Sequence, residues 1–214
     1  MKIYDVSMLV REGMMVYGGN PEPRIERVKS MPKSSSNLSK ITMGAHTGTH
    51  MDAGLHAANK GWTAHEVDLG KVMGKCRVLD LARVEFGCGI GEKELKKFKI
   101  KKGEIIVLKT KNSKRGFGKF RPDFIHVSLD GAEYLVKRGV KAVAIDALGI
   151  QKSGSGNMRV HDVFLRRRIP IFEGLNLKGV PAGRYAFIGL PLKLMAEAAP
   201  ARVILVKGLG KSWA

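Results

Sequence analysis

Five short runs of β-branched and other apolar residues are the feature that most constrains how this chain can fold. The runs are CRVLDLA at 76–82, EIIVLKT at 104–110, VKAVAID at 140–146, YAFIGL at 185–190 and ARVILVKG at 201–208. Each is bounded by glycine, proline or charged residues, which is the pattern of a strand between turns. The sequence therefore predicts that strands build the core of the molecule.

Helical patterns are fewer and weaker than the strand patterns. Three segments carry helix-forming residues, at 91–100, 128–139 and 160–168. Ser128 stands in a suitable N-cap position for the second segment, and the apolar residues that follow it fall on one helical face. With strands leading and helices fewer, we expect an α/β or α+β class with a mixed sheet. The chain shows no internal repeat or linker, so residues 1–214 are expected to form a single domain.

The chain is strongly basic, since 38 lysines and arginines face 19 acidic residues and the formal net charge is +19. Such a charge attracts phosphates, acidic membranes or anionic small molecules. The basic residues are densest at 93–121, which we interpret as a solvated surface. The aromatic residues of that segment, Phe98, Phe117 and Phe120, lack the context of an RNA-binding module. A basic protein that binds nucleic acid without catalysis is the alternative hypothesis.

Neither a membrane nor an oxidising compartment is indicated by the sequence. The first residues lack the apolar core of a signal peptide, and no apolar run approaches the roughly 20 residues that cross a bilayer. Cys76 and Cys88 do not form a CxxC pattern, which argues against a thiolate zinc site and a disulfide framework. We expect a soluble, cytoplasmic protein in which both cysteines are structural or incidental.

The most distinctive motif is HTGTHMDAGLH at 46–56. In a helix, His46 and His50 would share a face, but Asp52 and His56 would not, and the intervening threonines and glycines are poor helix formers. In an extended strand all four side chains point to the same side, because side chains alternate with period two. The spacing therefore predicts an extended backbone.

That extended backbone has to bend if its side chains are to meet. A straight strand over the motif would span on the order of 33 Å, whereas bonds from histidine to zinc are about 2.1 Å long. Gly48 and Gly54 are where a bend is easiest. Burying three imidazoles and a carboxylate together without a cation would cost free energy of desolvation, so the motif predicts a metal site. Imidazole and carboxylate ligands suit Zn, Mn or Fe(II).

The motif resembles HxGTHxDxPxH, the signature of the cyclase family of metal-dependent hydrolases, which includes bacterial kynurenine formamidase and isatin hydrolase. Further segments are similar to the family: VYGGNP at 16–21, GAEYLVKRGVKAVAIDA at 131–147, the stretch 160–194 and APARVILV at 199–206. The resemblance runs over nearly the whole chain. It implies an α/β fold of the swivelling β/β/α type, in one cyclase-like domain with a mixed sheet.

The resemblance also implies roles for individual residues. His46, His50 and Asp52 resemble ligands of a first metal ion, with Asp52 able to bridge to a second ion. His161 and Glu173 resemble the remaining ligand pair. The resemblance implies that one or two divalent ions bind per chain, with zinc as the first choice of metal and manganese as the alternative.

Catalysis and substrate binding follow from the same resemblance. His56 resembles the catalytic acid/base, and Tyr17 occupies the place of a substrate-contacting aromatic residue. The implied activity is hydrolysis of C–N bonds in small linear or cyclic amides. Arylformamidase activity comes first, converting N-formylkynurenine to kynurenine and formate in tryptophan catabolism, and an isatin-type hydrolase is the alternative. A homodimer or homotetramer is implied as well.

Three departures from the family pattern fall in segments expected to line the substrate pocket. Gly54 stands where the family has proline, and we expect this glycine to loosen the turn that positions His56. Gly18 and Gly19 alter the Pro-Gly pair beside Tyr17. At 149–151 the chain reads Gly-Ile-Gln where relatives carry serine, an aliphatic residue and an acid.

Overall fold

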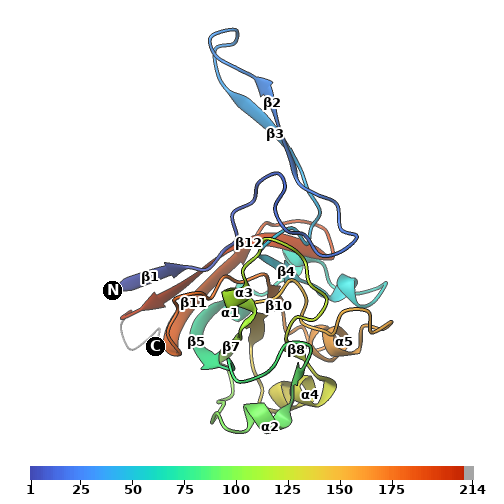
Figure 1. The fold of residues 1–214 in the computed structure, drawn as a ribbon, viewed down its shortest axis with the longest axis vertical. Coiled ribbons are helices and arrows are strands. Elements are labelled where there is room, and N and C mark those ends of the chain that lie inside the picture. The colour runs from blue at the N-terminus through green and yellow to red at the C-terminus, as the bar shows by residue number, and fades with distance from the viewer. Residues whose placement is uncertain (210–214) are drawn as a thin grey trace.

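The computed structural model describes residues 1–209, and one mixed sheet of eight strands forms its centre (Figure 1). The strands of this sheet are β1 (Lys2–Asp5), β4 (His50–Asp52), β5 (Met73–Asp80), β7 (Ile105–Lys109), β9 (Ala142–Ile145), β10 (Ile171–Glu173), β11 (Gly183–Pro191) and β12 (Ala198–Lys207). Their order is β1-β12-β11-β5-β7-β9-β10-β4, and β4 also pairs with β12. This last pairing closes the sheet into a barrel with β1 attached outside the closure.

The five predicted strands are confirmed, and so is the mixed sheet. β5, β7, β9 and β10 pair in parallel, whereas β11, β12 and β4 pair with their neighbours antiparallel. All four residues of β9 are buried, as are the four apolar residues of β7, because the barrel interior covers one face and further structure covers the other. Continuous apolar runs are the sequence signature of strands buried on both faces.

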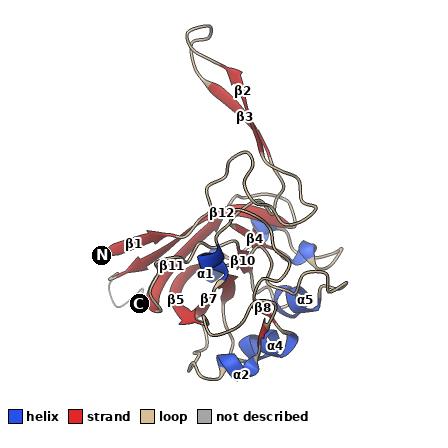
Figure 2. Cartoon of the chain, in the orientation of Figure 1, coloured by secondary structure: helices blue, strands red, loops and turns tan. Residues whose placement is uncertain are grey.

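The helices are short and lie beside the barrel (Figure 2). They are α1 (Leu69–Val72), α2 (Glu92–Leu95), α3 (Asn112–Arg115), α4 (Leu129–Lys137) and α5 (Arg159–Leu165), with 3₁₀ turns η1 (Gly54–His56) and η2 (Ala64–Glu66). The short strands β6 (Gly89–Ile90) and β8 (His126–Val127) pair in parallel next to α2 and α4. The predicted helices at 128–139 and 160–168 are therefore confirmed.

One bound of the helix prediction is wrong, whereas the predicted N-cap position is confirmed. The helix expected over 91–100 ends at Leu95, because the chain turns there and carries Ile100 into the core. Ser128 does occupy the N-cap position of α4, but its hydroxyl does not cap the helix. It donates instead to the Ile90 carbonyl and to Asp130, which ties α4 to the end of β6.

A two-stranded hairpin projects from the barrel and was not predicted. It consists of β2 (Arg24–Lys29) and β3 (Leu38–Thr42), and Figure 1 shows it extending well beyond the rest of the molecule. Every residue of both strands is exposed. Ile25 faces Ile41 across the pair, so apolar side chains are among those exposed.

The surface and the cysteines agree with the sequence analysis. The lysines of 93–102 are exposed, whereas Phe98 and Phe120 pack against the core and are not presented for stacking on bases. Cys76 is buried, Cys88 is exposed, and both thiols are free. Among residues 1–209, no helix has the length and apolar character needed to span a bilayer.

Candidate metal centre and active site

The site is built on β4, which lies between β10 and β12 in the barrel. His50 and Asp52 point to the same face of this three-residue strand, as period two predicts. Across the antiparallel pair, His50 is directly opposite Glu173 of β10. The His50 Nε2 atom lies 3.3 Å from Asp52 Oδ1 and 3.4 Å from Glu173 Oε2. All three side chains are almost completely buried.

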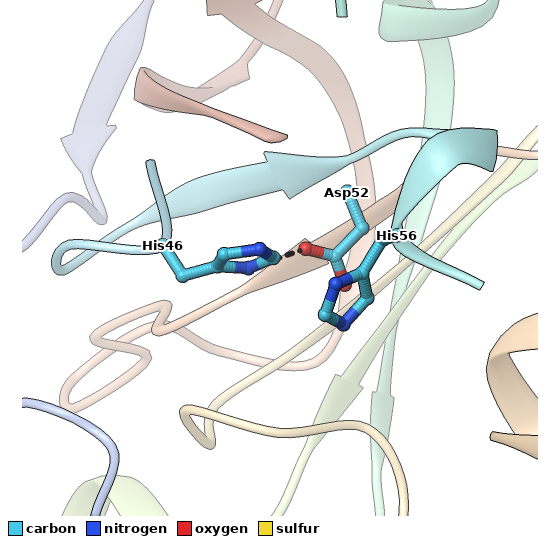
Figure 3. Close-up of side chains that lie close together, drawn as sticks. All are labelled: His46, Asp52 and His56. Atoms are coloured by element: carbon cyan, nitrogen blue, oxygen red, sulfur yellow. Dashed lines mark ion pairs between the residues drawn. The ribbon is translucent and has the colours of Figure 1, made fainter. Parts of the chain in front are cut away.

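His46 enters the site from the turn that precedes β4. Gly48 adopts a positive φ of 63° in this turn, which confirms a bend at that glycine. The bend brings His46 Nδ1 to 3.0 Å from Asp52 Oδ1, the contact drawn as a dashed line in Figure 3. On the other side of β4 the chain leaves the extended conformation at Gly54 and forms the turn η1. Both predicted departures from a straight strand are therefore present.

His161 and His56 complete the group from two different elements, α5 and η1. The Nε2 atom of His161, on α5, lies 3.5 Å from Glu173 Oε1 and 3.8 Å from Asp52 Oδ2. The His56 ring, carried by η1, lies 4.3 Å from the His46 ring and 5.1 Å from the His161 ring, measured between centroids. The fold thus brings together the predicted metal-site residues and the predicted acid/base, although they come from segments more than a hundred residues apart.

The electrostatics of the cluster are dominated by its two carboxylates. Burial alone would lower the pKa of His50, but Asp52 and Glu173 outweigh it and raise that pKa to about 10. Burial and Asp52 would raise the pKa of Glu173, yet the neighbouring His161 and His50 hold it at about 2. For His56 burial prevails and lowers the pKa, so its neutral form is favoured at neutral pH. A field this negative favours a cation at the centre of the cluster.

The donor atoms fit a divalent ion. Among the described residues, His50 Nε2 and both carboxylate oxygens of Asp52 are buried without a hydrogen-bond partner. Such atoms are costly unless something binds them. The other ring nitrogen of His50, Nδ1, lies 2.9 Å from the Gly48 carbonyl oxygen and donates to it, which leaves Nε2 free to bind a metal.

Within residues 1–209, two groups of donor atoms within metal-binding distance of one another share Asp52. One group is His50, Asp52 and Glu173, and the other is His46, Asp52 and His56. A carboxylate common to both groups is what a bridging ligand between two ions requires. The second group also shows that His56 lies within reach of a metal held by His46 and Asp52.

A cavity of 470 Å³ opens beside the cluster. His46, His50, His56, His161 and Glu173 all line it, and so does Tyr17. Its far wall is the loop 151–157, which Gln151 secures by accepting from Val160 N at 2.8 Å and donating to Ser155 Oγ at 2.5 Å. A volume of this size suits a small organic molecule.

Several contacts of the site are not predictable from the sequence. Tyr17 donates to Ser153 Oγ at 3.1 Å, which joins the predicted aromatic residue to the loop wall. Glu197, just before β12, lies 3.5 Å from His46 Nε2 although no motif marks it. Gly54, which was expected to loosen its turn, is buried, and a Cβ atom at this position would lie 2.3 Å from Trp62 Cδ1.

The chain is similar to curated enzymes along its whole length. The family model described as "Putative cyclase" matches residues 4–152. The kynurenine formamidase of Erythrobacter litoralis (strain HTCC2594) is 32% identical, over 95% of this chain and 93% of the relative. The kynurenine formamidase of Bacillus anthracis is 31% identical, over 95% of this chain and 97% of the relative.

Solved structures show the same fold. A predicted metal-dependent hydrolase from Bacillus stearothermophilus is 38% identical with a TM-score of 0.82, covering 95% of this chain and 97% of the other. Isatin hydrolase A from Labrenzia aggregata has a TM-score of 0.82 at 19% identity, covering 96% of this chain and 93% of the other, and therefore supports the fold alone. Together with the buried His/Asp/Glu cluster, these matches show that the chain belongs to the cyclase family of metal-dependent hydrolases.

Proposed function

We propose that this protein is a metal-dependent amidohydrolase and, most specifically, an arylformamidase that converts N-formylkynurenine to kynurenine and formate. The observation that carries the proposal is the position of His56 at the rim of a buried His/Asp/Glu cluster, inside a cavity of 470 Å³. Full-length relatives named kynurenine formamidase support the choice of substrate. We also propose that the enzyme is cytoplasmic and acts in tryptophan catabolism.

Five residues would hold the metal in this proposal: His46, His50, Asp52, His161 and Glu173. Zinc is the first choice and manganese the second, because imidazole nitrogens and carboxylate oxygens suit both ions. Asp52 Oδ1 lies 3.0 Å from His46 Nδ1 and 3.3 Å from His50 Nε2, which supports a carboxylate shared by two ions at full occupancy. When bound, a divalent ion acidifies water and stabilises negative charge on a carbonyl oxygen.

His56 would move the proton of the reaction. Water adds to the formyl carbon, forming a C–O bond, and the C–N bond to the aromatic amine then breaks. Neutral His56 accepts the proton that the attacking water loses and donates it to the departing nitrogen, so formic acid and a neutral amine result, and the acid then releases its remaining proton to solvent as formate. Two observations support this role: the His56 ring lines the cavity, and it lies 4.3 Å from the His46 ring, between centroids.

Tyr17 would bind the aromatic part of the substrate. Its ring lines the cavity and lies 4.6 Å from the Phe120 ring, between centroids, so the aromatic wall is fixed before a ligand enters. The hydrogen bond to Ser153 holds the phenol against the loop 151–157. A planar aryl ring can stack against a wall of this kind.

We further propose that the protein is a homodimer or homotetramer in which the β2–β3 hairpin contributes to the interface. A two-stranded hairpin is marginally stable in water unless it packs against something. Here both strands are exposed throughout, and Ile25 and Ile41 are 38% and 58% exposed. A second copy of the chain would cover these residues. The proposed partners are thus a small amide substrate and further copies of the chain, without nucleic acid.

The deciding experiment compares substrates on protein reconstituted with zinc or with manganese. We expect turnover of N-formylkynurenine, followed by the release of both kynurenine and formate, and less turnover of isatin. Faster turnover of isatin would favour the cyclic-amide alternative. Elemental analysis that finds no zinc or manganese, together with no turnover of either compound, would contradict the proposal. A nucleic-acid shift assay at moderate salt tests the non-catalytic alternative in parallel.

A further inference from the structure

Trp62 connects the two segments that carry His56 and His161. Its indole Nε1 donates to the carbonyl of Leu165 at 3.0 Å, and its own carbonyl accepts from Leu55 N at 2.9 Å. Leu55 is the neighbour of His56 in the turn η1. Leu165 is the last residue of α5, the helix that carries His161. A single buried residue thus bonds to both elements, to α5 through its indole and to η1 through its backbone carbonyl.

The indole ring fits only because residue 54 is glycine. A Cβ atom on Gly54 would lie 2.3 Å from Trp62 Cδ1 and 2.6 Å from Nε1, far inside van der Waals contact. Gly61 is equally confined, because its Cβ would lie 2.0 Å from the carbonyl carbon of Gly54. Any side chain at residue 54, including the proline of the family signature, would therefore displace the indole.

The Arg168 side chain also contacts this ring. Its guanidinium lies 5.4 Å from the ring centroid of Trp62, and its Nη2 donates to the Glu66 carbonyl at 3.2 Å. Trp62 itself is 8% exposed. The indole is therefore held by its hydrogen bond to the Leu165 carbonyl, by close packing against Gly54 and by its cation–π contact with Arg168. These three contacts leave the ring little freedom to move.

We propose that Trp62 is a positioning residue that sets the separation of the His56 and His161 rings, and that Gly54 is present in this chain to make room for it. The two rings are 5.1 Å apart between centroids and nearly perpendicular, at 75°. An error of about 1 Å in the placement of a catalytic group can cost on the order of 100-fold in rate. The importance of this spacing for turnover rests on the proposed function, but the spacing itself does not.

The first test needs neither metal nor substrate. Histidine-ring NMR spectra of the metal-free protein should show a nuclear Overhauser contact between His56 and His161 in the wild type. The contact should persist in Trp62→Phe at lower intensity and disappear in Trp62→Leu and in Gly54→Ala. Tyr185→Leu is the matched control, since Tyr185 is a buried aromatic residue of β11 that packs against Tyr4. It should lower stability while leaving the contact intact.

The second test is a double-variant cycle on the metal-loaded enzyme. Gly54→Ala and Trp62→Leu should each lower kcat at least tenfold with little change in KM and with the metal content of the wild type. The added Cβ atom of Gly54→Ala would lie 2.3 Å from the indole and 2.9 Å from the Trp62 backbone nitrogen, so most of its effect should come from the displaced indole. The loss in the double variant should therefore be clearly smaller than the product of the two single losses. Additive losses, or a histidine contact that survives in Trp62→Leu, would overturn the proposal. A wild type that turns over no amide but keeps the contact would refute only the proposed function.

Discussion

At the scale of single residues, the six side chains of the cluster are proposed to divide into ligands and one proton carrier, and two substitutions can separate these roles. His56→Gln should retain wild-type metal content and lose at least 100-fold in kcat, because a glutamine amide cannot exchange a proton at neutral pH. Metal content by elemental analysis and kcat on N-formylkynurenine are the two measurements. A variant that kept the wild-type rate would remove His56 from the mechanism.

Asp52→Ala should fail differently from His56→Gln. Asp52 belongs to both groups of donor atoms and is fully buried, so its loss removes a ligand from each group. We expect less than one tenth of the wild-type metal to remain after dialysis, with activity lost in proportion. Far-UV circular dichroism controls for folding. If the purified variant kept a full complement of metal, Asp52 would not be a ligand.

How far the site can be predicted depends on whether its residues are neighbours in the sequence. His46, His50, Asp52 and His56 lie within one motif, and period two with a bend at Gly48 was enough to group them. His161 and Glu173 have no such local pattern, and only the family resemblance pointed to them. Trp62 and Glu197 could not be found by either route, because their roles come from contacts that form when distant segments pack.

At the scale of elements, a buried polar network fixes the end of β9 beside the cavity. Asp146 directly follows β9 and accepts four hydrogen bonds, from the backbone N–H and the hydroxyl of both Thr110 and Ser113, at 2.7 to 3.1 Å. These bonds join the end of β7 and the helix α3 to β9. The chain then continues through Leu148 and Gly149 along the cavity wall.

Asp146→Ala should therefore destabilise the fold. It would leave four buried donors without an acceptor, and we expect the free energy of unfolding to fall by about 3 kcal/mol or more. Urea denaturation followed by circular dichroism measures this. Asp123→Ala is the control, because Asp123 pairs with Arg115 at 2.6 Å on an exposed surface, where ion pairs contribute little. If Asp146→Ala and Asp123→Ala lowered the free energy of unfolding equally, the buried network would stabilise the fold no more than the exposed ion pair does.

The burial and the length of each strand explain which elements could be predicted from the sequence. β7 and β9 are buried on both faces, so their apolar runs stand out. β4 is three residues long, and the period-two spacing of its motif predicts its extended backbone but not its place in the sheet, which comes from pairing with both β10 and β12. β2 and β3 contain four apolar residues among charged ones and pack on no core, so nothing in their composition separates them from a loop.

At the scale of the whole molecule, the net charge of +19 has to be reconciled with a small-molecule enzyme. Surface lysines such as those of 93–102 can attract nucleic acid without specificity, by releasing counterions. We expect any binding of a DNA duplex in a shift assay to vanish between low and moderate salt, with kcat on the amide substrate unchanged by the DNA. Binding that persisted at moderate salt would revive the nucleic-acid hypothesis.

The last prediction concerns the role of the projecting β2–β3 hairpin in the proposed homo-oligomer. Ile25 and Ile41 face each other across β2 and β3, so they form one exposed apolar pair on one face of the hairpin. If a second copy covers that pair, Ile25→Asp with Ile41→Asp places two charges in the interface and should weaken the oligomer at least tenfold. Light scattering coupled to size-exclusion chromatography measures the mass. Lys40→Glu changes the charge of β3 without altering the apolar pair and should keep the wild-type mass. A wild type that is monomeric at micromolar concentration would refute the assembly, and the hairpin would then need another partner to offset its exposed apolar surface.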